Sequence, residues 1–198
     1  VADIPGSMRR NAVAFSINNK GYIGTGMTTV EAGDPMALKL NDLWEYTPSL
    51  NSWVQKANFP GFGGVGIYFS TAFTSGSKAY LVGGKLGPNN YSNQTWEYDP
   101  ALDSWLQRAN FIGGVRYQLS SFTINDKGYA GLGTDQDVYR DDWYEFKPST
   151  NTWVQKANLP GSERGSATTF TIGQRGFVCM GTNGGSLEDL WEYNEGTN

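Results

Sequence analysis

The stretch Asn51-Ser52-Trp53-Val54-Gln55-Lys56-Ala57-Asn58 recurs twice, with small changes, in this chain of 198 residues. The second copy starts at Asp103 and contains Trp105, and the third starts at Asn151 and contains Trp153. The tryptophans are about 50 residues apart, a period that is typical of arrays of small structural repeats. The whole chain is therefore best interpreted as a repeat array before any single motif is considered.

Two further blocks recur upstream of these copies, each of them four times. One is an aromatic block around a glutamate, at residues 43–46, 95–98, 143–146 and 190–193. The other is a hairpin block with a basic residue, at residues 18–22, 76–80, 125–129 and 173–177. Turns that are rich in Asn, Asp, Gly and Pro separate the blocks. Each repeat therefore predicts four short antiparallel strands.

A four-stranded sheet with two partly apolar faces is unstable alone, and blades that pack around an axis bury both faces. We therefore expect an all-β propeller that forms one domain over residues 1–198, with four repeats of four antiparallel strands. The blades are expected at about residues 7–59, 62–111, 114–159 and 162–198. The tryptophan that opens a fourth strand occurs in three copies, so the last blade is expected to lack its outer strand. We expect that this chain alone does not close the ring, and that it associates with itself or continues into further blades.

The second strand of each repeat ends in glycine, as in Gly21-Tyr22-Ile23-Gly24-Thr25-Gly26, the third is aromatic, and the fourth opens with tryptophan. These features resemble the kelch motif over essentially the whole chain, and they are most similar to secreted bacterial kelch proteins of the Bacteroidetes type. The resemblance implies a β-propeller that is secreted, periplasmic or attached to the cell surface. Gly83-Gly84 keeps the double glycine of the motif, whereas the other repeats carry Thr25, Leu132 and Met180 at its first position.

The composition argues against several classes of site. The chain contains no histidine and a single cysteine, Cys179, so it lacks the commonest general base and cannot form a cysteine zinc cluster. Its formal net charge of -4 argues against a general nucleic-acid-binding surface. No apolar run approaches the roughly 18 residues of a membrane span. We therefore expect no catalytic residue, no bound metal and no cofactor in this chain.

The loops that lead into the first strands carry the candidate ligand-binding residues. Three of the four repeats place an arginine six residues before the first-strand phenylalanine, and the second repeat has Ile67 there. The neighbouring positions add a further arginine and two tyrosines, so the full candidate set is Arg9, Arg10, Tyr68, Arg116, Tyr117 and Arg164. Guanidiniums at the channel mouth would suit a carboxylate or a polyhydroxylated ligand, with tyrosines for stacking. The alternative is that the arginines bridge neighbouring blades through backbone carbonyls.

Carboxylates gather in the third repeat at Asp135, Asp137 and Asp141. Oxygen ligands this close together could hold calcium, although the spacing lacks the glycine and glutamate of a known calcium loop. A solvated turn is the alternative interpretation. The glutamate of the aromatic block occurs in every repeat, and a residue that every blade shares is expected to serve the scaffold.

The sequence favours a non-catalytic binding or scaffold module, because it shows no nucleophile with a base, no phosphate loop and no metal cage. Its loop face would engage a protein or carbohydrate partner. The alternative is a metal-independent carbohydrate-active kelch enzyme, such as a sugar mutarotase or epimerase. Fold alone does not choose between these two functions.

Overall fold

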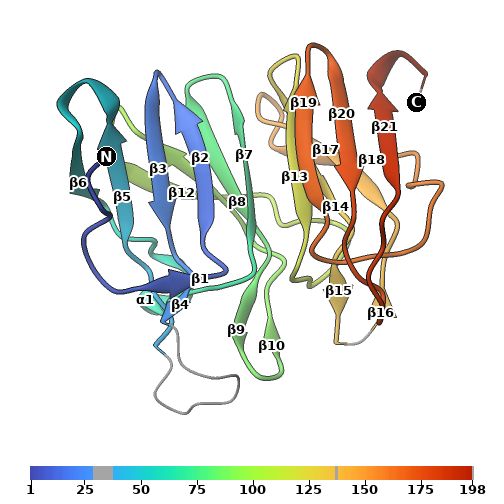
Figure 1. Ribbon diagram of the computed structural model, residues 1–198, viewed down its shortest axis with the longest axis horizontal. Helices are drawn as coiled ribbons and strands as arrows, with labels where there is room; N and C mark the ends of the chain where they lie inside the picture. Colours follow the sequence, from blue (N-terminus) through green and yellow to red (C-terminus); the bar gives the residue numbers. More distant parts are fainter. Residues whose placement is uncertain (29–37, 137, 198) are drawn as a thin grey trace.

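The computed structural model describes residues 1–28, 38–136 and 138–197, which form four antiparallel sheets in succession along the chain (Figure 1). The first sheet contains, in spatial order, β2 (Val13–Ile17), β3 (Lys20–Gly24), β5 (Leu43–Thr47) and β6 (Ser52–Lys56). The second contains β7 (Thr71–Ser75), β8 (Lys78–Val82), β11 (Thr95–Asp99) and β12 (Ser104–Arg108). The third contains β13 (Ser120–Ile124), β14 (Lys127–Gly131), β17 (Trp143–Lys147) and β18 (Thr152–Lys156). The fourth contains β19 (Thr168–Ile172), β20 (Arg175–Cys179) and β21 (Leu190–Asn194).

Tight hairpins set the register between the first two strands of each blade. Asn18 and Asn19 have φ angles of 52° and 60°, and Asn125 and Asp126 have φ angles of 48° and 62°. Two successive left-handed residues define a type I′ turn, and Asn and Asp tolerate this conformation better than most side chains. The strands that the turns join alternate in burial, so that one side of each sheet packs against a neighbouring sheet.

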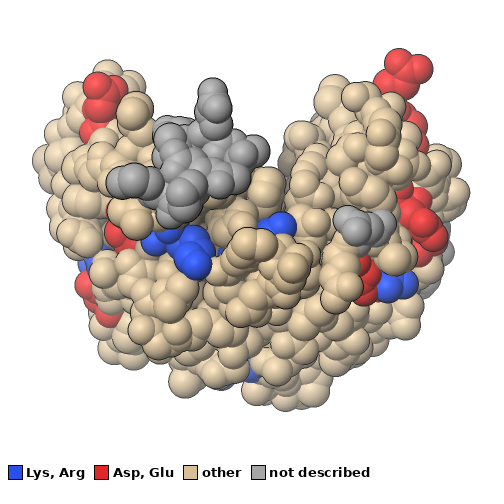
Figure 2. All heavy atoms as spheres, turned by 90° about the horizontal axis from the view of Figure 1, so that it is seen from below, with Lys and Arg blue, Asp and Glu red and all other residues tan. Residues whose placement is uncertain are grey.

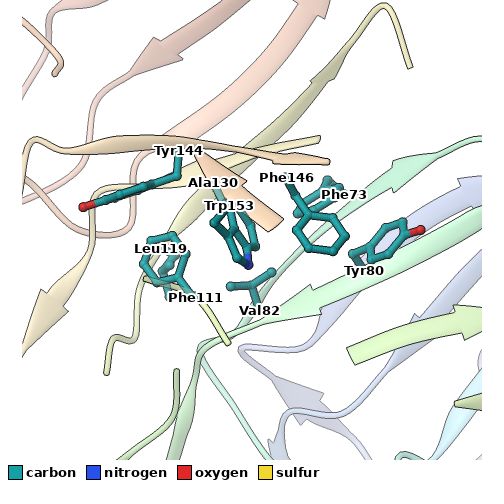
Figure 3. Close-up of a cluster of buried hydrophobic side chains, with 9 residues drawn as sticks. All are labelled: Phe73, Tyr80, Val82, Phe111, Leu119, Ala130, Tyr144, Phe146 and Trp153. Carbon is teal, nitrogen blue, oxygen red and sulfur yellow. The ribbon is translucent and has the colours of Figure 1, made fainter. Parts of the chain in front are cut away.

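The hydrophobic cores lie between consecutive blades. The inner strand β7 packs beside β2 on one side and β13 on the other, and β13 packs beside β19. Figure 3 shows the core between the second and third blades, where Phe73 and Tyr80 from one blade meet Phe146 and Trp153 from the next. Each blade therefore buries its apolar faces only by stacking on its neighbours, as the repeat pattern predicts.

A close approach between blades explains a recurring hairpin glycine. A Cβ atom added to Gly128 would lie 1.9 Å from the ring of Phe73, which belongs to the preceding blade. Gly176 stands in the same relation to Phe122, at 2.7 Å. Any larger side chain at these positions would push the inner-strand phenylalanine out of the interface between blades.

The four sheets form an open arrangement around their common axis. Figure 2 shows a broad hollow between the lobe at the left, which contains the first blade, and the lobe at the right, which contains the fourth. The chain is thus an all-β propeller of four antiparallel blades that does not close a ring by itself, in agreement with the predicted fold class.

Several short elements in the loops were not predicted. Three two-stranded ladders lie together at one end of the blades, at the bottom of Figure 1. They are β1 (Arg9–Arg10) with β4 (Met27–Thr28), β9 (Lys85–Gly87) with β10 (Asn90–Tyr91), and β15 (Thr134–Asp135) with β16 (Val138–Tyr139). The remaining elements are the short helix α1 (Gly61–Gly64) and the 3₁₀ turns η1 (Pro48–Leu50) and η2 (Glu195–Thr197). None of the helices in the described ranges has the length and apolar composition to cross a membrane.

Candidate ligand-binding site on the loop face

The loops that lead into the first strands meet the loops that follow the second strands at the end of the propeller that carries the short ladders (Figure 1). In every blade, the residue three positions before the inner strand pairs with the residue that follows the glycine at the end of the second strand. The four equivalent pairs are Arg10 with Met27, Tyr68 with Lys85, Tyr117 with Thr134, and Gly165 with Thr182. The backbone repeats in these pairs while the side chains differ, as expected of a scaffold that presents a variable site.

Three of the predicted ligand-binding arginines point into their own blades. Arg9 forms an ion pair with Asp42, with 2.6 Å between Nη2 and Oδ2, and Arg164 donates from Nη2 to Asp189 Oδ2 at 2.7 Å. Arg116 forms the equivalent ion pair with Asp142. The side chains of Arg116 and Arg164 are 2% and 0% exposed, so neither presents its guanidinium to a ligand.

The same arginines also donate to backbone carbonyls. Arg9 Nη1 donates to Thr25 O at 3.3 Å, and Arg164 Nη1 donates to Met180 O at 3.0 Å. Arg116 Nη1 donates to the equivalent carbonyl, Leu132 O, at 3.3 Å. Each bridge connects two loops of one blade, whereas the sequence-based alternative placed it between neighbouring blades. The link between blades at this point is made by the backbone, since Gly84 N donates to Arg116 O at 2.7 Å.

The second blade replaces this ion pair with an apolar contact. Ile67 occupies the arginine position and is 0% exposed, in a cluster that includes Phe59 and Leu81. Gln94 occupies the aspartate position and accepts a hydrogen bond from Trp96 Nε1 at 2.8 Å, as Asp42 does from Trp44 at 2.7 Å. Both charges are absent together, so neither is left buried without its partner.

The other three predicted residues lie at the rim of the loop face with an unpredicted lysine and tyrosine. The rings of Tyr91 and Tyr117 stack with centroids 4.9 Å apart and an interplanar angle of 9°. The Lys85 ammonium lies 4.8 Å from the Tyr117 centroid and 5.4 Å from the Tyr91 centroid. Phe69 connects this stack to Tyr68, at 6.1 Å from Tyr117 and 5.5 Å from Tyr68. The rim cluster is defined here as Arg10, Tyr68, Phe69, Lys85, Tyr91 and Tyr117.

The electrostatic character of the rim cluster is cationic. Burial raises the pKa of the Tyr68 phenol, Tyr91 raises it further, and the charge of nearby Arg10 acts in the opposite direction. In the part of the chain that the structure describes, Lys85 forms no ion pair with a carboxylate. Figure 2 looks onto this face and shows Lys and Arg side chains at the surface near its middle. The cluster therefore combines positive charge with aromatic faces and phenolic hydroxyls.

A belt of backbone hydrogen bonds holds the rim in place. Phe69 N donates to Asn11 O at 3.1 Å, Gln118 N to Phe69 O at 3.0 Å, and Ser166 N to Gln118 O at 2.9 Å. All four of these residues are left-handed, with φ between 54° and 57°. The belt runs from blade to blade, so the side chains that flank it are carried on rigid backbone. A phenylalanine in this conformation is unfavourable, and the surrounding structure must impose it.

Lys85 and Tyr91 were not among the ligand-binding residues predicted from the sequence, because that prediction rested on the arginine positions of the repeats and their neighbours. A residue that differs between blades at a shared position is a functional candidate, and this criterion applies equally to the residue after the glycines. That position reads Met27, Lys85, Thr134 and Thr182, and it would have identified the lysine. Tyr91 lies in a loop of variable length, where no repeat position identifies it.

The carboxylates of the third repeat engage different partners. Asp135 Oδ2 accepts from Arg140 Nη2 at 2.7 Å, and Asp141 Oδ1 accepts from Asn158 Nδ2 at 3.0 Å. Asp137 lies outside the described residues. Across the described ranges, no three His, Cys, Asp or Glu side chains gather in a way that could hold a metal ion.

The glutamates of the third strands are held in ion pairs. Glu45 accepts from Lys20 Nζ and from Tyr22 OH, both at 2.6 Å. Glu97 pairs with Lys78 at 2.6 Å and with Arg108 at 3.2 Å. These carboxylates connect neighbouring strands within a blade, which is the scaffold role expected of a residue that every blade shares.

Comparison with known proteins supports the fold and bears on the function. A solved structure titled "Structure of YjhT" matches 98% of this chain and 65% of its own, with a TM-score of 0.79 and 16% sequence identity. The fold is a kelch-like β-propeller. No family model matches the sequence.

Curated relatives match part of the sequence. The chain is 33% identical over 84 residues to the N-acetylneuraminate epimerase of Yersinia enterocolitica serotype O:8 / biotype 1B, and 31% identical over 84 residues to that of Haemophilus influenzae strain PittEE. Each match covers 42% of this chain and 21% of the relative's length. These relatives contradict the prediction of a non-catalytic binding or scaffold module. They favour the alternative, a carbohydrate-active enzyme of the sugar epimerase type.

Proposed function

We propose that the loop face of this chain binds an acidic sugar of the N-acetylneuraminate type and takes part in a metal-independent epimerase or mutarotase reaction. The observation that carries the proposal is the Lys85 ammonium above Tyr91 and Tyr117, with Arg10 and Tyr68 nearby. Cationic groups bind a carboxylate through charge-assisted hydrogen bonds. Aromatic faces pack against the C–H groups of a sugar ring, and phenolic hydroxyls bond to its polar groups.

The chemistry of the ligand relates these groups to a reaction. In N-acetylneuraminate the carboxylate is attached to the anomeric carbon itself. A cation that holds the carboxylate at Lys85 therefore also fixes the anomeric carbon and the ring oxygen beside the rim phenols. Positioning of this kind supplies a large part of enzymatic rate enhancement.

Exchange between the anomers requires opening and closing of the sugar ring. In the proposed reaction, Tyr68 gives its phenolic proton to the ring oxygen as the bond from that oxygen to the anomeric carbon breaks. The anomeric hydroxyl gives its proton to water, and the open-chain ketone forms. A phenol is protonated at neutral pH, and burial raises the pKa of Tyr68 further, so Tyr68 holds the proton that this step uses. Rotation and closure by the reverse steps give the other anomer and return the proton to Tyr68.

The test is anomer exchange measured by proton NMR with N-acetylneuraminate and the isolated chain. The exchange rate is expected to rise in proportion to protein concentration. N-Acetylmannosamine, a neutral sugar without a carboxylate, is the matched control and is expected to show no acceleration. Equal acceleration of both sugars would contradict the assignment of the cationic rim.

The match covers only 21% of the length of the curated relatives, so this chain can bind the sugar without catalysing the whole reaction. Binding is therefore measured separately, by ligand-detected NMR. Saturable binding of N-acetylneuraminate without acceleration would support the acidic-sugar site and contradict turnover by this chain alone. Absence of both binding and acceleration would overturn the whole proposal.

We also propose a location outside the cytoplasm, as a secreted, periplasmic or cell-surface protein. The similarity of the Gly21–Gly26 and Trp-Glu-Tyr blocks to those of secreted bacterial kelch proteins supports it. Fractionation of a producing cell, with the chain found in the cytoplasmic fraction, would contradict it.

A further inference from the structure

The fourth repeat has no side chain at a loop-face position where the other repeats carry a large one. The residue that pairs with the one after the second-strand glycine is Arg10, Tyr68 and Tyr117 in the first three repeats, and Gly165 in the fourth. Gly165 is buried, and its φ lies outside the left-handed region that favours glycine. The backbone conformation does not require this glycine, so its role is to admit a close neighbour.

Two side chains of the third repeat close over Gly165. A Cβ atom added to Gly165 would lie 3.0 Å from Gln118 Oε1, 3.2 Å from Gln118 Cβ and 3.3 Å from Tyr139 Cε1. These distances are shorter than ordinary contacts of a Cβ atom, so glycine lets the amide and the ring lie directly against the backbone. Gln118 and Tyr139, named here the amide–ring pair, are both half-buried.

The backbone of Gln118 is held firmly while its side chain is not used internally. Gln118 N donates to Phe69 O at 3.0 Å, and Gln118 O accepts from Ser166 N at 2.9 Å. Its φ of 57° is left-handed, a conformation that the belt imposes. Among the residues that the structure describes, the Gln118 side-chain amide has no hydrogen-bond partner. A half-buried amide of this kind offers both a donor and an acceptor to a ligand.

The amide–ring pair lies across Tyr117 from the Lys85 ammonium. Lys85 Nζ is 4.8 Å from the centroid of the Tyr117 ring. Tyr117 pairs with Thr134, and Thr134 pairs with Tyr139 in the ladder of β15 with β16 (Figure 1). Directly paired residues project to the same face, so Tyr117 and Tyr139 flank Thr134 on one surface, about 10 Å apart. Tyr117 therefore separates the cation from the amide–ring pair.

The charges beside the amide–ring pair neutralise each other. Asp135 follows Thr134 and Arg140 follows Tyr139, and these two residues form an ion pair with 2.7 Å between Nη2 and Oδ2. Successive residues of a strand point to opposite faces, so this ion pair lies on the other side of the ladder from Tyr139. The amide–ring pair therefore suits a neutral polar group, whereas Lys85 suits a carboxylate.

We propose that Gln118 and Tyr139 form a subsite for the acetamido group of an acidic sugar, a role that rests on the function proposed above. The Gln118 amide and the acetamido group each offer an N–H and a carbonyl, so they form two complementary hydrogen bonds. The acetamido methyl group packs on the Tyr139 ring. In N-acetylneuraminate the carboxylate and the acetamido group leave opposite corners of the sugar ring, which matches two binding groups on opposite sides of Tyr117. Gln118 thereby determines specificity among acidic sugars.

The test compares two sugars on the complete chain by ligand-detected NMR titration. One is N-acetylneuraminate, and the other is its deaminated analogue, which carries a hydroxyl in place of the acetamido group. The native chain is expected to bind N-acetylneuraminate about tenfold more tightly, because the analogue leaves the Gln118 amide unpaired. Gln118→Ser is expected to remove this preference and to change affinity for the analogue by less than about twofold. Serine occupies the same belt position in the fourth repeat, as Ser166 with φ of 54°, so the backbone accepts it.

Gly165→Ala tests the subsite without removing the amide. The added Cβ atom displaces Gln118 and Tyr139, so the preference for N-acetylneuraminate should fall by about threefold or more as the two hydrogen bonds lengthen. Asn11→Ser is the matched control, because it changes the belt position of the first repeat and should leave the preference unchanged. Thermal denaturation of each variant checks that the blades remain folded.

The outcomes separate the subsite from the proposed function. Equal affinity of the native chain for the two sugars would overturn the subsite and leave the carboxylate site at Lys85 standing. An equal loss of affinity for both sugars in Gln118→Ser would do the same, because it would assign Gln118 a structural role. Binding of neither sugar to the native chain would overturn the proposed function, and the subsite with it.

Discussion

Arg116 and Asp142 form a buried ion pair in the third blade, and the second blade replaces both partners, with Ile67 and Gln94. This paired replacement predicts a non-additive mutant cycle. Arg116→Ile alone should lower the free energy of unfolding by about 3 kcal/mol, because it leaves Asp142 without its cation. Arg116→Ile combined with Asp142→Gln should recover at least half of that loss. Urea denaturation of the single and double variants measures both values, and simple additivity would contradict the interpretation.

The second blade offers the reciprocal control. Ile67→Arg should destabilise the chain, because it places a guanidinium in the apolar cluster of Phe59 and Leu81. Adding Gln94→Asp should restore part of the loss. A neutral Ile67→Arg variant would mean that the site can open to water.

The repeat itself contained most of the information on the fold. The recurring Trp53, Trp105 and Trp153 blocks located the outer strands, and the Asn-rich turns located the hairpins, because both depend on local sequence. The short ladders such as β9 with β10 were not predicted, since their pairing depends on how two loops meet in space. The burial of Arg116 and Arg164 could not be read from spacing either, because their aspartate partners lie 26 and 25 residues further along the chain. Lys85 could have been predicted as a binding candidate, because the four repeats carry different residues at its position.

Acidic pH should weaken the ion pairs that Arg164 and Arg9 form with Asp189 and Asp42. The hydrogen bonds from Arg164, which outweigh the opposing effect of burial, hold the pKa of Asp189 well below its usual range. Burial raises the pKa of Asp42, but hydrogen bonds from Arg9 and Trp44 outweigh it and lower the pKa overall. A depressed carboxyl pKa stabilises the folded state above the unfolded value of about 3.9, and this stabilisation is lost as pH falls toward the folded value. The free energy of unfolding should therefore fall between about pH 5 and pH 2. Asp189→Asn should show a shallower fall in urea titrations at each pH.

The double-glycine position predicts a stabilising substitution. Thr25, Leu132 and Met180 have φ of 58°, 56° and 60° where Gly83 has 64°, so every blade needs a left-handed residue there. Met180 is 57% exposed and loses little burial when it is shortened. Met180→Gly should raise the free energy of unfolding by about 0.5 kcal/mol, because removing left-handed strain outweighs the added freedom of the unfolded chain. Thermal and urea denaturation measure this change.

Leu132→Gly is the matched control for that substitution. Leu132 has the same conformation but is 0% exposed, within the core between the third and fourth blades. Its replacement should lower the free energy of unfolding by about 2 kcal/mol or more, because the lost burial exceeds the relieved strain. Stabilisation by both variants, or by neither, would contradict the assignment of backbone strain to this position.

Lys85→Met tests the rim cluster without disturbing the scaffold. The Lys85 ammonium contacts two aromatic faces and no described carboxylate, so its removal should change the free energy of unfolding by less than about 1 kcal/mol. Affinity for N-acetylneuraminate should fall about tenfold, because a charge-assisted hydrogen bond to the carboxylate is lost. Lys147→Met, at an exposed end of β17, is the control and should leave affinity unchanged. Ligand-detected NMR titration separates the two variants, and equal affinities would show that Lys85 does not contact the sugar carboxylate.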